Sequence, residues 1–252
     1  MIPVSVVIIT KNESAVINRC IESIRSLTDD ILVCDTGSTD QTMLIASQSG
    51  ARVIQLPWEG YGATKNAAHL HAKYDWIFSL DADEYIDEKL CHALLKNNWD
   101  RHDRAYCIRR TGFFQGKRIR FGSWLGEKKI RIFPRSKSFW DQSIVHEKLE
   151  LNNLMIQTIQ GKIIENNPQR KEQYVQKLDF YARLCAQKYL HRNIQGAGLK
   201  KIMSPVYNFF YNYIIRLGFL DGKEGLILCR LNAWYTFKKY DYVLKIKHKQ
   251  HS

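Results

Sequence analysis

The sequence predicts an α/β protein in which a mostly parallel sheet, with helices on both faces, precedes a C-terminal helical extension. Four apolar strand patterns alternate with helical patterns over residues 4–83, at the spacing of right-handed crossover units. From about residue 166 the apolar residues recur at helical spacing. The chain has 252 residues, 45% of them hydrophobic and 25% charged, which is typical of a folded globular protein with a sizeable core.

The elements of the first part follow from their patterns. Residues 4–9 are a continuous β-branched run, typical of a central parallel strand that is buried on both faces. Further strands are predicted at 31–34, 51–56 and 76–80. Helices are predicted at 13–27, with Ser14 as a possible N-cap, at 42–49, where Gly50 ends the helix, and at 63–72.

The later part changes character. From about Tyr106 to Ile164 the chain consists of short strand-like pieces rich in arginine and aromatic residues. Residues 172–191 then have the apolar spacing of an amphipathic helix, and residues 205–220 continue with a second apolar stripe. We therefore expect one domain over residues 1–165 and a basic, aromatic-rich helical extension over residues 166–252.

Charge is unevenly spread. The formal net charge is +13, but residues 1–100 hold 8 Lys and Arg against 14 Asp and Glu, while residues 101–252 hold 30 against 11. The basic part predicts an anionic partner: nucleic acid, an anionic membrane surface or a phosphorylated substrate. No run of 18 uncharged apolar residues occurs, and the apolar start lacks a basic n-region, so we expect a cytoplasmic protein. The six cysteines are scattered, which argues against a disulfide framework or a structural zinc site.

Polar residues gather in the loops that follow the predicted strands. These loops are Thr10 to Glu13, Asp35 to Asp40 and Asp81 to Glu84, and the carboxyl ends of parallel strands are where such sheets bind ligands. Asp81 and Asp83 form a DxD motif, and paired carboxylates suit Mg²⁺ or Mn²⁺ held together with substrate phosphates. Neither GxGxxG nor GxxxxGK[ST] is present, so the usual phosphate-binding loops of dehydrogenases and P-loop NTPases are absent.

Four segments carry a family resemblance: VSVVIITKNE, VCDTGSTDQT, PWEGYGATKNAA and WIFSLDADE. Together they resemble the family 2 glycosyltransferases, which are inverting enzymes with the nucleotide-sugar-binding fold called GT-A. The resemblance implies a donor half at 1–100 and an acceptor half at 101–165. It also implies that Lys65 contacts the diphosphate. The DxD motif of the family falls on Asp81 and Asp83, with Asp83 as the implied metal ligand. The implied nucleoside-binding residues are Thr10, Asn12, Glu13 and Asp35.

A narrower resemblance is to the lipopolysaccharide core-biosynthesis branch, which includes β-1,4-glucosyltransferases acting on the first heptose. It rests on WEGYG, LDADEYI, a Gly-Ser-Trp segment leading to Arg131-Ile-Phe, Val-His146-Glu147, and FLDG near residue 220. Where that branch tends to have a histidine, this chain reads Ile-Glu165-Asn. The resemblance implies UDP-glucose as donor, with Arg131 among the nucleotide-sugar ligands. It implies a lipid-anchored saccharide as acceptor, at the cytoplasmic face of the inner membrane.

Two alternatives remain open at this stage. The same chemistry could serve another acceptor, such as a capsule, another surface glycan or a protein. A basic nucleic-acid-binding protein would also explain the positive charge and interleaved aromatics, but it leaves the DxD motif unexplained, so we expect no nucleic acid partner.

An inverting transfer needs a carboxylate base near the acceptor hydroxyl and separate from the metal ligands. Glu147 follows the strand-like residues 143–145 and is the predicted base, and Asp141 is the runner-up. The basic, aromatic C-terminal region predicts peripheral attachment to an anionic membrane.

Overall fold

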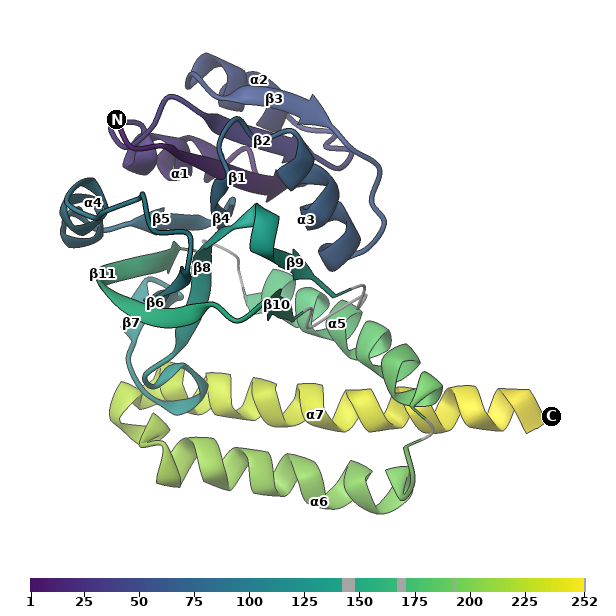
Figure 1. Cartoon of the computed structure of the whole chain (residues 1–252). Coiled ribbons are helices and arrows are strands. Elements are labelled where there is room, and N and C mark those ends of the chain that lie inside the picture. Colours follow the sequence, from purple (N-terminus) through teal and green to yellow (C-terminus); the bar gives the residue numbers. More distant parts are fainter. Residues whose placement is uncertain (142–147, 167–170, 193, 252) are drawn as a thin grey trace. The chain divides into compact units, whose positions relative to one another are not determined.

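The structure is a computed structural model of the chain, and it describes all residues except 142–147, 167–170, 193 and 252 (Figure 1). The chain divides into two compact units. Unit 1 contains residues 1–111 and 127–167, and unit 2 contains residues 112–126 and 168–252. The stretch 112–126 therefore groups with the C-terminal helices, whereas the sequence alone assigned it to the first domain.

Unit 1 is built on a mixed sheet whose parallel strands come first in the chain. They are β1 (Val4–Thr10), β2 (Ile31–Asp35), β3 (Arg52–Gln55) and β4 (Trp76–Asp81). Their spatial order is β3-β2-β1-β4, and every neighbouring pair is parallel. Each strand is joined to the next by a helix, as crossover connections between parallel strands require.

The remaining strands of the sheet extend it beyond β4. They are β8 (Lys128–Pro134), β6 (Arg104–Phe114), β11 (Met155–Asn166) and β5 (Glu84–Ile86), in that order. The pairs β4–β8, β8–β6 and β11–β5 are antiparallel. Among the strand pairs whose orientation is described, the parallel ones belong to the first four strands, and the arginine-rich strands β6 and β8 pair in antiparallel fashion. The predicted α/β class with a C-terminal helical extension is confirmed.

Helices cover both faces of the sheet. Alternate residues of β1 point to opposite sides, so Val6 and Ile8 pack in one apolar cluster and Val7 in another. The first cluster includes residues of α1 (Ile17–Ile24), α2 (Thr42–Gln48) and α4 (Glu88–Leu95). The second includes α3 (Tyr61–Leu70) and the two-stranded sheet of β9 (Ser138–Trp140) and β10 (Leu149–Leu151). Burial on both faces explains the nearly continuous apolar run of β1, in which Ser5 is the one polar residue before Thr10.

Two helix predictions are corrected. The first helix spans Ile17–Ile24 rather than 13–27; its N-cap position is Val16, which makes no side-chain cap bond. Ser14 is not the N-cap, because it lies two residues before that position; its backbone N–H donates to Asp40 (3.2 Å) in the next loop. The helix placed at 205–220 begins earlier, as α6 (Ala197–Phe210), and contains Pro205 in its interior.

Unit 2 is helical apart from β7 (Lys117–Ile119), which pairs with the end of β6 and is followed by the short helix η1 (Gly122–Trp124). The second short helix in chain order, η2 (Arg135–Lys137), belongs to unit 1. After α5 (Lys171–His191) and α6 come η3 (Tyr211–Ile215), η4 (Gly218–Asp221) and α7 (Gly222–His251). Both α5 and α6 pack against α7 (Figure 1). Among the described residues, no helix is long and apolar enough to cross a bilayer.

One buried carboxylate ties the two segments of unit 2 together. The carboxylate of Asp221 accepts backbone hydrogen bonds from Arg120 (3.1 Å) and Phe121 (2.9 Å). Nearby, a Cβ added to Gly225 would lie 2.1 Å from the carbonyl oxygen of Gly218, so only glycine permits this approach. The FLDG segment and the Gly-Ser-Trp segment, far apart in sequence, are therefore neighbours.

Candidate functional site

Two carboxylates flank the end of β1 at one edge of the sheet. In the strand register, Thr10 lies opposite Asp35 of β2, and Ile9 lies opposite Asp81 of β4. Because neighbouring strands are about 4.8 Å apart, the backbones of Asp35 and Asp81 are roughly 10 Å from each other. The structure therefore brings the polar strand ends together at the edge where α/β sheets bind ligands.

The loops after β1 and β2 are held to each other by hydrogen bonds. The backbone N–H of Asn12 donates to the hydroxyl of Ser38 (2.8 Å), and the N–H of Thr39 donates to Oδ1 of Asn12 (2.8 Å). Asn12 adopts a φ of 56°, a left-handed conformation that asparagine tolerates better than most residues. The N–H of Glu13 donates to the hydroxyl of Thr42 (2.8 Å). Asn12 and Glu13 are thus fixed by the second loop.

Asp35 organises its own turn. Its Oδ1 accepts the N–H groups of Gly37 and Ser38, both at 2.8 Å, and its Oδ2 accepts the hydroxyl of Ser38. Asp35 is fully buried, so in this conformation it shapes the loop, and its direct contact with a nucleoside stays a prediction. The hydroxyl of Thr10 beside it is buried and has no hydrogen-bond partner among the described residues, which leaves it available to a ligand.

A second loop carboxylate, Asp40, is ionised even in acid. Burial acts to raise its pKa, but hydrogen bonds from the hydroxyl (2.5 Å) and amide (3.0 Å) of Thr42, together with Ser14, lower the pKa of Asp40 to about 2. The charge of Asp40 therefore helps to hold the loops together at all physiological pH values.

The DxD segment is anchored by a buried arginine. Nη2 of Arg131, on β8, lies 2.8 Å from Oδ2 of Asp81 and 2.6 Å from Oε1 of Glu84. The side chain of Asp81 is 43% exposed, whereas that of Glu84 is completely buried. Burial acts to raise the pKa of Asp81, but the charges of Arg131 and Lys65 hold it well below its usual range. Asp81 is thus a fixed anion that faces solvent at the strand end.

Glu84 extends this arrangement into an ion-pair network. Its Oε1 is 2.9 Å from Nε of Arg110, which also pairs with Glu127 (3.2 Å) and Glu165 (2.5 Å). Burial raises the pKa of Glu84, against the opposing charge of Arg131. All of the hydrogen-bond partners described here for Glu84, including the N–H of Asp81 (3.1 Å), are donors, and this geometry suits a carboxylate.

Helix α3 brings a further cation and a second segment to the edge. Nζ of Lys65 lies 4.4 Å from the ring centroid of Trp140, and the charge of Lys65 lowers the pKa of Asp81. Asn66 pairs with the backbone of Trp140 through two hydrogen bonds (2.8 and 2.9 Å). A Cβ added to Gly62 would lie 1.9 Å from the carbonyl oxygen of Asp141, so the glycine permits this close packing.

Of the two candidate bases, the structure describes Asp141 but not Glu147. Asp141 follows β9, and its Oδ1 accepts the N–H of Lys148 (3.0 Å). Its backbone N–H donates to the carbonyl of Lys148 (2.8 Å). Glu147 lies outside the described residues, so its role as base stays a prediction.

Sequence comparison identifies the family. The family described as "Glycosyl transferase family 2" matches residues 5–157, which is more than half of the chain. The chain belongs to glycosyl transferase family 2. It is 30% identical to the uncharacterized glycosyltransferase RP128 of Rickettsia prowazekii, over 93% of this chain and 84% of that protein. It is 27% identical to the lipopolysaccharide core biosynthesis glycosyltransferase LpsC of Rhizobium meliloti, over 94% and 90% of the two chains.

Among solved structures, the glycosyltransferase is similar to Staphylococcus aureus TarS in complex with UDP-GlcNAc. The TM-score is 0.49 and the identity 15%, over 100% of this chain and 93% of that one.

The side chains of this glycosyltransferase fit a divalent cation. Magnesium and manganese need only one or two protein carboxylates when substrate phosphates supply further oxygens. Asp81 offers an ionised, partly exposed carboxylate, and Asp83 follows it two residues later in the same loop. In the described part of the chain, no cluster of three or more metal-ligating side chains occurs, so the cation would depend on the substrate for its other ligands.

Sequence reasoning missed Glu84 and Arg110 as parts of the site. In the sequence, Glu84 is a polar loop residue beside the DxD motif, and Arg110 is one of many arginines, so neither position indicates a role in the site. Both residues join the site because antiparallel strands bring together segments that are far apart in the sequence. Residue patterns do not reveal such pairing.

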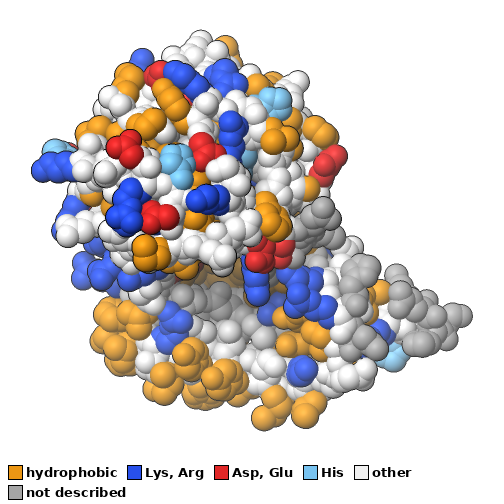
Figure 2. Space-filling model, in the orientation of Figure 1, with side chains coloured by type: hydrophobic (Ala, Val, Ile, Leu, Met, Phe, Trp, Pro, Cys, Tyr) orange, Lys and Arg blue, Asp and Glu red, His pale blue; other side chains and the backbone are white. Residues whose placement is uncertain are grey.

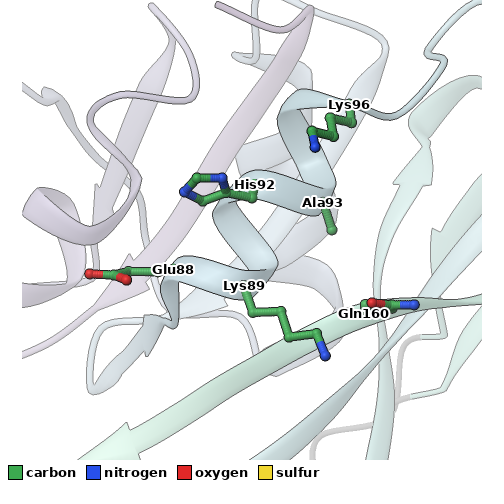
Figure 3. Close-up of a pocket in the computed structure, with 6 residues that line it drawn as sticks. All are labelled: Glu88, Lys89, His92, Ala93, Lys96 and Gln160. Atoms are coloured by element: carbon green, nitrogen blue, oxygen red, sulfur yellow. The ribbon is translucent and has the colours of Figure 1, made fainter.

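A hollow elsewhere in unit 1 is separate from this site. It is lined by residues of α4, including Glu88 and His92, and by Gln160 of β11 (Figure 3). None of its lining residues belongs to the predicted donor site, and Glu88 and Lys89 point in different directions.

Proposed function

We propose that this glycosyltransferase transfers glucose from UDP-glucose, with inversion, to a heptose of the lipopolysaccharide inner core. The observation that carries the proposal is the gathering of Asp81, Arg131 and Lys65 at the sheet edge beside the interlocked loops after β1 and β2. The likeness to LpsC, a lipopolysaccharide core enzyme by name, supports the acceptor class. In this proposal residues 1–100 form the donor half, 101–165 the acceptor half, of which 112–126 groups with the C-terminal helices, and 166–252 the extension.

In this proposal the chain binds the nucleoside with loop residues and the diphosphate with positively charged side chains. The nucleoside lies against the loops of Thr10, Asn12, Glu13 and Asp35. Lys65 and Arg131 place positive charge near the diphosphate, where cations stabilise the developing negative charge of the leaving group. Arg131 also fixes Asp81 in position through its 2.8 Å contact.

Asp83, with Asp81 beside it, would hold Mg²⁺ or Mn²⁺. When bound, this cation neutralises negative charge on the departing diphosphate. Glu147, with Asp141 as the alternative, takes the proton from the acceptor hydroxyl on the opposite side of the sugar. The acceptor is lipid-anchored, so the enzyme works as a peripheral protein at the cytoplasmic face of an anionic inner membrane.

A transfer assay tests the proposal. Purified protein with Mn²⁺ should release UDP from UDP-glucose only when lipopolysaccharide from a deletion strain is added. Mass spectrometry of that strain's lipopolysaccharide should show a core short of one hexose. An Asp83→Ala variant should be inactive, and Glu150→Ala, an exposed carboxylate on β10, should retain activity. An unchanged core in the deletion strain would refute the acceptor, and failure to bind any nucleoside diphosphate would refute the whole proposal.

A further inference from the structure

Helix α6 exposes an apolar stripe of the kind that a water-soluble helix buries. The residues that recur at helical spacing on its outer side are large and apolar: Leu199, Ile202, Met203, Val206, Phe210 and Ile214. We call these six residues the apolar face, and each is between 48% and 70% exposed. A helix at a protein surface normally shows its charged residues to water and buries such a stripe.

The inner side of the same helix carries polar contacts. Lys201 pairs with Asp241 of α7 (2.7 Å), which shows that this side faces α7. Asn212, in the turn that continues the helix, is buried, and its amide donates to the carbonyl of Asn208 (2.9 Å). The chain therefore buries an asparagine just after the helix while it exposes isoleucine and phenylalanine.

The exposed surface continues past the helix with little charge. Between Ala197 and Leu220 fourteen residues are exposed, and Lys200 is the one charged residue among them. Figure 2 shows hydrophobic side chains gathered over α6. Tyr207 and Tyr211 stack with ring centroids 5.6 Å apart, and tyrosine is a residue favoured at the boundary between lipid and water. An uninterrupted patch of this kind marks an interaction site.

The charge of unit 2 indicates what covers the patch. Its two segments hold 19 lysines and arginines against 5 acidic residues, a net charge of +14, while unit 1 holds 19 against 20, a net charge of −1. The excess positive charge of the chain thus resides in the unit that carries the apolar face. Lys200 and Lys223, both exposed, lie just inside and just beyond the apolar stretch. A second copy of the chain would bring two strongly basic units together, whereas anionic lipid headgroups complement the charge.

We propose that residues 197–220 form an interfacial membrane anchor, which lies in the plane of an anionic bilayer with the apolar face among the acyl chains. The described helices are too short or too polar to span a bilayer, and a helix with an apolar side and basic flanks suits the interface instead. The inference does not depend on sugar transfer, because it rests on unit 2 alone.

Flotation of the full chain with vesicles tests the anchor. The protein should float with phosphatidylcholine vesicles that contain phosphatidylglycerol, and bind weakly to phosphatidylcholine alone. Added salt should reduce the binding without abolishing it, because apolar insertion is not screened. Replacing Ile202, Phe210 and Ile214 together by glutamine should weaken binding at least about tenfold, since three large apolar side chains lose their contact with lipid.

A matched variant controls for the loss of exposed apolar surface. Leu44, Leu70 and Ile156 are also exposed but belong to unit 1, and their replacement by glutamine should leave vesicle binding unchanged. Both variants should keep the circular dichroism spectrum and the UDP affinity of the parent. Vesicle binding then reports on the anchor alone, and UDP affinity reports on the donor site. Wild-type protein that does not float with anionic vesicles, or an α6 variant that floats equally well, would overturn the proposal. A dimer in lipid-free buffer that the α6 variant converts to a monomer would overturn it too, in favour of a protein interface.

Discussion

Replacing Arg131 by methionine should destabilise the enzyme strongly. Arg131 is buried, and its Nη2 contacts both Asp81 (2.8 Å) and Glu84 (2.6 Å). Methionine has a similar length and fits an apolar cavity, so the variant removes the charge and the hydrogen bonds with little change of volume. What remains is a completely buried carboxylate, Glu84, whose nearest cation is Arg110 (2.9 Å).

The expected loss follows from the burial of Glu84. Removing one partner of a buried ion pair costs about 3 to 5 kcal/mol, because the other charge is left without compensation. Arg110 still neutralises part of the charge, which favours the lower end, about 3 kcal/mol. Asp81 adds little to the stability loss because its side chain is 43% exposed and water can solvate it.

Urea denaturation at neutral pH measures this loss. Lys128→Met, at the exposed end of the same strand, is the control and should change the free energy of unfolding by less than about 0.5 kcal/mol. Adding Glu84→Gln to Arg131→Met should recover at least about 1 kcal/mol, since the uncompensated charge is then removed. A loss below about 1 kcal/mol for Arg131→Met, or strict additivity in the double variant, would show that Glu84 does not depend on Arg131.

Further variants test individual side chains. Asp83→Ala should lower turnover at least about a hundredfold and abolish its response to added Mn²⁺ while the unfolding midpoint is kept; full activity would exclude Asp83 as the metal ligand. Glu147→Gln should lower turnover roughly 10² to 10⁴ fold with UDP-glucose affinity unchanged; normal turnover, alongside an inactive Asp141→Asn, would assign the base to Asp141. Burial, with Lys65 and Arg135 nearby, lowers the pKa of His69 to about 3, so His69 contributes stability above pH 6.5 that is lost as the pH falls. Between pH 6.5 and 5 the stability of wild type relative to His69→Phe should fall by roughly 2 kcal/mol in urea titrations, and parallel pH profiles would contradict this.

The parallel half of the sheet could be predicted because its signals are local. The run from Val4 is buried on both faces and has Ser5 as its single polar residue before Thr10, and each following helix has an apolar period. The polar strand ends were also recognisable, since the carboxyl ends of parallel strands share one edge by geometry. Asp35 and Asp81 therefore lie where the sequence placed them, on either side of β1.

The antiparallel half and the ion-pair network could not be predicted in the same way. Arg131 reaches Glu84 because β8 pairs with β4, and Arg110 reaches Glu165 across β6 and β11. Such pairings join residues that are 47 and 55 positions apart, and no periodicity within one strand records them. The exposure of the apolar stripe of α6 could not be predicted either, because a helical stripe of apolar residues has the same sequence pattern whether it contacts protein or lipid.

Charge balance at the donor edge gives a reason to expect dependence on a divalent cation. The carboxylates of Asp81, Asp83 and Glu84 lie in one short segment, and the positive charges that lower the pKa of Asp81 most are those of Arg131 and Lys65. Arg110 is shared with Glu127 and Glu165, so it brings no surplus positive charge.

A diphosphate that enters this edge meets three carboxylates, and we expect it to need a further cation to be held there. Removing divalent cations with EDTA should weaken UDP affinity at least about tenfold, measured by calorimetry, and Mn²⁺ or Mg²⁺ should restore it. Asp83→Asn should show the weaker affinity with or without the cation. Equal UDP affinity of the wild-type protein in EDTA and in Mn²⁺ would mean that Lys65 and Arg131 suffice, and the charge argument would then be wrong.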